Sequence, residues 1–167
     1  PFISKYVKNS TMSLDDVQRK ILRLLQSNGR LSSKDVAKEI GSPVTTAYTR
    51  IKRLEELGII KGYKAVLDPK KLDRSTTAFI LASFAYPASK EGLVSQRKIT
   101  KEVASYPEVQ EVHTITGEWD MLIKVRSKDV DAVSNFVMNN LRAMSGIEKT
   151  LTCIVFETAK ESTDIMI

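Results

Sequence analysis

The sequence predicts an α+β protein in which a helix-turn-helix domain precedes a ferredoxin-like βαββαβ domain. Up to residue 58, apolar residues recur at helical spacings of three and four, and from residue 76 short apolar strands alternate with two helical segments. The charge divides in the same way: residues 1–64 hold 13 Lys and Arg against 6 Asp and Glu, whereas residues 65–167 hold 13 against 14. Periodicity and charge together indicate two domains with different partners.

The first helix is expected to follow residues 1–13, which we interpret as an N-terminal extension. Ser13 is its expected cap, and Gly29 is its stop signal. The apolar positions that define the buried face lie three or four residues apart: Leu14, Val17, Ile21, Leu24 and Leu25.

A second, shorter helix is expected to begin at Ser32 or Ser33 and to end before Gly41. The third is expected to start with Ser42 as its cap and Pro43 as its first helical residue, because a proline at that position loses no helical hydrogen bond. It ends at Gly58, and its buried stripe consists of Ala47, Ile51 and Leu54. Three helices in this order, with a tight turn before the third, predict a helix-turn-helix DNA-binding domain over residues 14–64.

Residues 59–67 are predicted to form a strand that Gly62 interrupts, and residues 65–75 a hinge and polar linker. The ferredoxin-like domain is assigned to residues 76–167. Its expected elements, in order, are a strand over 76–86, a helix over 90–106, strands over 109–116 and 119–126, a helix over 129–144 and a strand over 148–157. Gly117 and Glu118 suit a two-residue type II′ turn between the central strands.

The first and last of these strands are apolar on both faces. In a ferredoxin-like sheet both helices lie on one face, so the other face would expose a large apolar patch. A second copy of the chain is the most economical cover, and a homodimer also suits a symmetric DNA reader. The alternative is that the linker covers part of the patch.

Opposite the buried stripe, the third helix presents hydroxyl-bearing and basic side chains. A step of 100° per residue places Thr45, Thr49 and Lys52 on the free face, flanked by Thr46, Tyr48 and Arg53. Threonine hydroxyls and methyls suit base edges, and the cations suit phosphates or guanine. Lys34, Lys61 and Lys64 are expected to reach the flanking DNA backbone. The alternative is an ordinary solvated helix face.

The sequence gives little support for a catalytic, metal-binding or membrane function. The single histidine, His113, and the single cysteine, Cys153, cannot form a zinc site or a disulfide, and neither a nucleophile elbow nor a phosphate-binding loop is present. We therefore expect no catalytic residues, no metal and no cofactor. No apolar run approaches the roughly 20 residues of a membrane helix, and no export signal is recognisable, so we expect a cytoplasmic protein without membrane contact.

Residues 116–120, Thr-Gly-Glu-Trp-Asp, suggest a small-molecule site. A glycine turn leaves main-chain N–H groups accessible to a carboxylate, and Asp120 offers a negative charge to an ammonium group. The two groups together fit an α-amino acid. The alternative is a plain hairpin turn with an aspartate at its edge.

Four motifs occur in order from Leu14 onward: LDDVQRKIL, NGRLSSKDVAKEIG, TRIKRLEELGIIKGYKAVLDPKKL and TGEWDMLIKV. Together they resemble the leucine-responsive regulator and asparagine-regulator (Lrp/AsnC) family. The resemblance implies a winged helix-turn-helix, a hinge strand and an amino-acid-sensing domain that dimerises through its sheet and assembles into tetramers or octamers. It also implies an effector site between dimers around Gly117, Trp119 and Asp120, with Thr150 and Thr152 as neighbours.

These observations predict a sequence-specific DNA-binding transcriptional regulator that an amino acid modulates. A rival hypothesis is an amino-acid sensor that acts mainly through protein partners, and another is an enzyme of amino-acid metabolism. The basic first third argues against the sensor alone, because its charge suits a polyanion such as double-stranded DNA. The lack of a converging acid, base and nucleophile argues against the enzyme.

Overall fold

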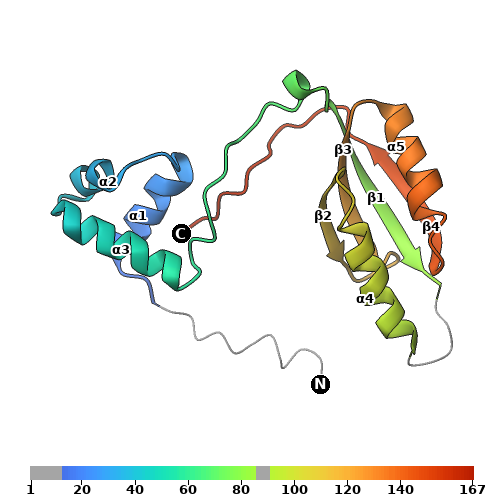
Figure 1. Cartoon of the computed structure of the whole chain (residues 1–167), viewed down its shortest axis with the longest axis horizontal. Coiled ribbons are helices and arrows are strands. Elements are labelled where there is room, and N and C mark those ends of the chain that lie inside the picture. The colour runs from blue at the N-terminus through green and yellow to red at the C-terminus, as the bar shows by residue number, and fades with distance from the viewer. Residues whose placement is uncertain (1–12, 86–90) are drawn as a thin grey trace. The chain divides into compact units, whose positions relative to one another are not determined.

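The computed structural model describes residues 13–85 and 91–167, and the chain divides into two compact units (Figure 1). Residues up to Val66 form the first unit together with Ser162–Ile167, and Leu67–Glu161 form the second. Of the expected N-terminal extension, residues 1–12 lie outside the described residues. Each unit has its own apolar core.

Helix α1 spans Asp16–Ser27, and its cap is Asp15 rather than Ser13. The Asp15 carboxylate accepts a hydrogen bond of 2.7 Å from the main-chain N–H of Gln18, and the Gln18 side chain accepts one of 2.9 Å from the N–H of Asp15. Gln18, three residues after Asp15, supplies the reciprocal bond of this capping box. The helix therefore begins after Asp15, and the prediction of Ser13 as its cap is wrong.

Helix α2 (Ser33–Ile40) is capped by Ser32, one of the two predicted caps, and helix α3 spans Val44–Glu56. The predicted cap of α3, Ser42, is wrong, because Ser42 closes the previous helix instead. Its N–H donates to the carbonyl of Ala37 at 3.0 Å across Gly41, whose φ of 66° permits the left-handed turn. Pro43 is extended and immediately precedes α3.

The three helices pack around one core. The buried members of this core are Ile21, Leu22, Leu25, Val36, Ala37, Ala47, Ile51 and Leu54. The last three are the predicted stripe of α3. An ion pair of 2.5 Å between Arg50 of α3 and Asp15 links α3 to the cap of α1. The structure therefore has the predicted helix-turn-helix, with α3 held on its apolar side.

The predicted strand over residues 59–67 is wrong. Within this segment every residue except Ile60 is exposed, and Val66 is fully so. A strand forms only when a neighbour accepts its hydrogen bonds, and no described residue of this chain pairs with the segment. In the linker that follows, Lys70–Leu72 form one short 3₁₀ turn, η2.

The second unit has the predicted βαββαβ order. Its strands are β1 (Thr76–Phe84), β2 (Val109–Thr114), β3 (Met121–Ser127) and β4 (Ile147–Ile154), arranged as an antiparallel sheet in the order β2-β3-β1-β4. Helix α4 (Glu91–Val103) follows β1, and α5 (Val130–Phe136) follows β3. Residues 86 and 90, at the ends of the predicted first strand and helix, lie outside the described residues.

Both helices cover the same face of the sheet (Figure 1). Alternate residues of β1 and β3 pack with α4 and α5 in one core, which includes Ile80, Ile123, Val103 and Leu141. After Phe136, α5 continues as a π-helical turn, Val137–Leu141, which keeps Phe136 and Leu141 buried although they are five residues apart. None of the described helices is long and apolar enough to cross a membrane.

The other face of the sheet carries an apolar row that no helix covers. In this row Leu81 of β1 pairs with Leu122 of β3 and with Leu151 of β4. Phe79 and Cys153 lie side by side in the adjacent row. Leu151 is 46% exposed and Cys153 is also exposed, so this surface, which we call the open face, contains the apolar patch that the sequence predicts.

Candidate DNA-binding surface and effector loop

The candidate DNA-reading surface is the side of α3 that faces away from the core. With Ala47, Ile51 and Leu54 buried, all six predicted α3 residues are exposed: Thr45, Thr46, Tyr48, Thr49, Lys52 and Arg53. They cover about two and a half helical turns, and the major groove of DNA admits an α-helix. The structure thus places the predicted reading residues together on one solvent-facing surface.

Glu55 and Glu56 of α3 form ion pairs with two cations of the same helix, Lys52 and Arg53. Lys52 forms an ion pair of 2.9 Å with Glu55, which also accepts a hydrogen bond of 3.1 Å from the Tyr63 hydroxyl. The hydrogen bond to Glu55 raises the pKa of Lys52, and the same contact lowers the pKa of the Glu55 carboxyl. Arg53 lies 3.6 Å from Glu56. A phosphate must therefore compete with a carboxylate for each of these two cations.

The hydroxyl of Thr49 donates a hydrogen bond of 2.9 Å to the carbonyl of Thr45, one turn earlier. This bond fixes the rotamer of Thr49, so that its methyl and hydroxyl have a set orientation on the exposed face. A fixed, short side chain of this kind suits contact with a base edge or a thymine methyl.

Lys34, Lys61 and Lys64 flank this surface in the same unit. Lys34 is the second residue of α2, and Lys61 and Lys64 lie in the extended segment after α3. All three are exposed, and within the described ranges none of them belongs to an ion pair. Their charges are thus accessible to a polyanion.

The candidate effector loop joins β2 to β3. It is longer than the predicted two-residue turn, because β2 ends at Thr114 and β3 begins at Met121. The N–H of Ile115 donates to the carbonyl of Asp120 at 2.9 Å and closes the loop, while Gly117 has a φ of 123°. The prediction of a type II′ turn is therefore wrong, but Gly117 does occupy a conformation that favours glycine.

Asp120 is attached to β1 through its main chain and its side chain. Its N–H donates to the carbonyl of Ala82 at 3.1 Å, and its Oδ2 accepts a hydrogen bond of 2.9 Å from the N–H of Phe84. These bonds fix the carboxylate at the end of β1. The sequence alone did not indicate this structural role.

Trp119 and Glu118 reach across the end of β1 to Lys149 of β4. The Lys149 ammonium lies 4.8 Å from the centre of the Trp119 ring and 3.9 Å from Oε1 of Glu118. Sequence reasoning missed Lys149, because only the sheet order brings β4 beside a loop that is about thirty residues earlier in the chain.

The predicted neighbours Thr150 and Thr152 lie on β4, paired with Ala82 and Ile80 of β1. Thr150 is adjacent to Lys149 and is half-buried, whereas Thr152 is exposed and two residues further along the strand. No hydrogen bond joins either threonine to the described residues of the loop. Because successive side chains of a strand point to opposite faces, both threonines lie on the face opposite to the one that carries Lys149.

Ser83, which pairs with Lys149, adds a buried hydroxyl at the same end of the sheet. The residue is 5% exposed, and no described residue provides a hydrogen-bond partner for its Oγ. A buried hydroxyl without a partner is costly, so it marks a place where a further polar group would be stabilised. The sequence gave no signal for it.

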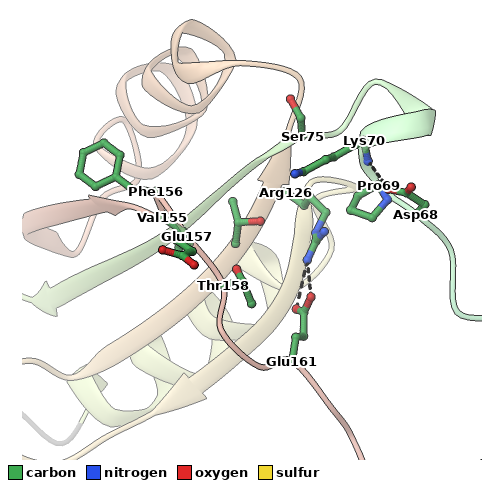
Figure 2. A pocket seen from close by; sticks show the side chains of 11 residues that line it. Asp68, Pro69, Lys70, Ser75, Arg126, Val155, Phe156, Glu157, Thr158 and Glu161 are labelled. Atoms are coloured by element: carbon green, nitrogen blue, oxygen red, sulfur yellow. Dashed lines mark hydrogen bonds and ion pairs between the residues drawn. The ribbon is translucent and has the colours of Figure 1, made fainter.

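A separate cavity of about 370 Å³ lies where the linker and the chain after β4 meet the sheet (Figure 2). Its polar lining includes Arg126, whose guanidinium binds Glu161 at 2.9 Å, and Lys70. None of the predicted effector residues lines this cavity.

The described part of the chain contains no cluster of side chains that could hold a metal ion. No group of three or more His, Cys, Asp and Glu side chains is placed to hold a metal ion there. His113 is exposed, with Nε2 3.2 Å from Oε2 of Glu111, and Cys153 is exposed on the open face rather than buried as a core residue.

Both units of the chain match models of known protein families. Residues 14–61 match the model described as winged helix-turn-helix DNA-binding, and residues 89–165 match the Lrp/AsnC ligand binding domain. An HTH-type transcriptional regulator of Pyrococcus abyssi is 40% identical over 148 residues, which cover 89% of this chain and 96% of that protein.

Solved structures agree with these matches. The transcriptional regulator NMB0573 of Neisseria meningitidis, crystallised as a complex with L-Met, is 29% identical, has a TM-score of 0.83 and is matched over 92% of this chain and 97% of that one. An AsnC family transcriptional regulator of Agrobacterium tumefaciens is 31% identical, with the same TM-score and the same coverage.

Proposed function

Because the chain belongs to the Lrp/AsnC family of DNA-binding transcriptional regulators, we propose that the exposed face of α3 reads DNA and that the effector loop binds an α-amino acid which tunes this binding. The observation that carries the proposal is the exposed surface of α3. Six residues suited to base and phosphate contacts share it, while the opposite stripe is buried.

The residues of this surface divide into two roles. Thr45, Thr46, Tyr48 and Thr49 contact base edges, since their hydroxyls and methyls match groups in the major groove. Lys52 and Arg53, together with Lys34, Lys61 and Lys64, bind phosphates and position the helix. The ion pairs with Glu55 and Glu56 hold the α3 cations until phosphates replace the carboxylates.

For the amino acid, the main-chain N–H groups around Gly117 receive the carboxylate, and Asp120 binds the ammonium. The bond from Phe84 orients the Asp120 carboxylate, which can accept several hydrogen bonds at once. Trp119 borders the site, and Thr150 lies next to Lys149 on the neighbouring strand, with Thr152 beyond it. The complex of the Neisseria structure with L-Met supports an amino acid as the class of effector.

The functional unit is a homo-oligomer, at least a dimer and in larger assemblies a tetramer or octamer. The open face, with Leu81, Leu122 and Leu151 in one row, supports a dimer in which two sheets cover each other. Two reading helices would then meet half-sites about 34 Å apart, one turn of DNA, in a near-palindromic operator.

We place the protein in the cytoplasm, where it would meet double-stranded DNA and free amino acids, and we assign it no catalytic step and no cofactor. An amino-acid sensor that acts through protein partners is the alternative. The exposed basic surface around α3 favours the DNA reader, because a protein-binding sensor does not need it.

Calorimetric titration of the protein with each of the twenty amino acids tests the effector, and a gel-shift titration with DNA from upstream of its own gene tests the reader. We expect one or a few amino acids to bind and to change the affinity for DNA. Amino-acid binding without DNA binding would support the protein-partner alternative. If no amino acid gave a heat of binding, the loop would have no effector role and would be a plain connection between β2 and β3.

A further inference from the structure

Residues 162–167 belong to the DNA-binding unit, although they are the last residues of the sequence. Ile165 and Gln26 of α1 exchange two hydrogen bonds: the N–H of Ile165 donates to Oε1 of Gln26 at 2.7 Å, and Nε2 of Gln26 donates to the carbonyl of Ile165 at 3.0 Å. The glutamine side chain thus takes the place that a neighbouring strand would occupy.

A second set of contacts lies two residues further on. Nε of Arg23 donates to the main-chain oxygen of Ile167 at 2.7 Å, and the Ile167 side chain packs, partly buried, against the helix-turn-helix core. Met166, between the two contacts, is fully exposed, and Ile165 is 70% exposed. The segment therefore docks through its main chain and one apolar side chain, in a defined register.

The residue just before this segment is fixed to the other unit. Glu161 forms ion pairs with Lys124 and Arg126 of β3, whose side chains are only 12% and 15% exposed. Only Ser162, Thr163 and Asp164 separate Glu161 from Ile165. The sheet unit is thus joined to the DNA-binding unit at both of its ends, once through the linker after Val66 and once through this segment.

We propose that residues 162–167 are a strap whose docking on α1 sets the affinity of the protein for DNA. Docked, the strap connects the sheet to α1, and the ion pair between Asp15 and Arg50 connects the start of α1 to the reading helix. Undocked, the DNA-binding unit is tied by the linker alone and samples more orientations. A dimer that must place two α3 helices on two half-sites then binds with an additional entropic cost.

The main-chain N–H of Ile165 allows a sharp test in the full-length protein. Ile165→Pro removes this donor, while Ile165→Ala keeps it and shortens the same exposed side chain. Hydrogen exchange at the amides of α1 would report docking. Binding would be measured to DNA from upstream of the protein's own gene and to a duplex with one half-site of that DNA.

For Ile165→Pro we expect exchange in these amides to become at least about threefold faster, and affinity for the two-half-site DNA to fall about tenfold. Affinity for the single half-site should stay within about twofold, and Ile165→Ala should resemble the wild type in all three measurements. Equal behaviour of the two variants would overturn the proposal. Faster exchange without loss of affinity would also overturn it, as would an equal loss on both DNAs, because that would indicate local damage to the reading unit.

A second experiment serves if the proline variant does not fold. The chain is ended after Glu161, and a synthetic peptide of residues 162–167 is added in excess. The proposal predicts that the peptide restores slow exchange in α1 but not the affinity for two-half-site DNA, since a separate peptide is not connected to the sheet. Recovery of both properties would contradict it.

Discussion

The N–H of Phe84 donates a hydrogen bond of 2.9 Å to Oδ2 of Asp120, so the residue that we assign to the effector's ammonium also fastens the end of β1. One carboxylate thus serves the fold and the proposed site. A substitution there changes both unless the acceptor is preserved.

The first prediction separates these two roles. Asp120→Ala leaves the partly buried N–H of Phe84 without its acceptor and should lower the free energy of unfolding by about 1–3 kcal/mol. Asp120→Asn keeps an oxygen for this bond and should cost much less stability, yet it removes the charge that an ammonium requires. Urea unfolding and amino-acid calorimetry would be measured on both variants. An asparagine variant that binds the amino acid as tightly as the wild type would remove Asp120 from the site.

The second prediction concerns the two roles on α3. Thr49→Val keeps the shape of the side chain and removes its hydroxyl, so it should relax base preference by about 1–3 kcal/mol at one position of the operator. Lys52→Gln should weaken binding to specific and random DNA alike. Binding-site selection followed by anisotropy titration would measure both effects. The division of roles fails if both variants lose affinity equally on the two DNAs.

The third prediction concerns the open face. Leu151 lies in its apolar row and is 46% exposed, so Leu151→Glu should leave the monomer folded while placing a charge where a second sheet would pack. Sedimentation at micromolar concentration should show at least a dimer for the wild type and a smaller species for the variant. Val130→Glu, at the exposed first residue of α5, is the matched control and should sediment like the wild type. A wild-type monomer would contradict the dimer.

The fourth prediction is a pH dependence at Glu161. Hydrogen bonds from Lys124 and then from Arg126 lower the pKa of the Glu161 carboxyl below its ordinary value of 4.5. Its contribution to stability is therefore complete above that ordinary pKa and is lost as the pH falls through the lowered one. Wild type and Glu161→Gln should differ in melting temperature at pH 7 and converge as the pH falls below the lowered pKa. A difference that persists at low pH would mean that the carboxylate charge is not the cause.

Sequence patterns predicted the order of helices and strands because that order depends on local periodicity. The buried stripe of α3 follows directly from apolar residues three or four apart, and β1 from a short apolar run. Caps were harder to predict, since Asp15 and Ser13 are both good cap residues and only the reciprocal bond to Gln18 distinguishes them.

Features that depend on distant residues could not be predicted in this way. The contact of Lys149 with Trp119, the bond from Phe84 to Asp120 and the docking of Ile165 on Gln26 join residues that no sequence spacing relates. The expected strand over residues 59–67 shows the converse, because its residues favour a strand but the described chain offers it no partner. The candidate reading residues could be grouped from the sequence because a single helix contains most of them.

The salt dependence of DNA binding tests the central claim most directly. Anisotropy titrations from 50 to 200 mM salt would compare DNA from upstream of the protein's own gene with a scrambled duplex of equal length. If a dimer binds ~6–10 phosphates through the basic first unit, affinity should fall by about 10³- to 10⁵-fold over this range, with the upstream DNA preferred. A flat salt response with equal affinity for both duplexes would contradict the assignment of α3 and its flanking lysines as a DNA-reading surface.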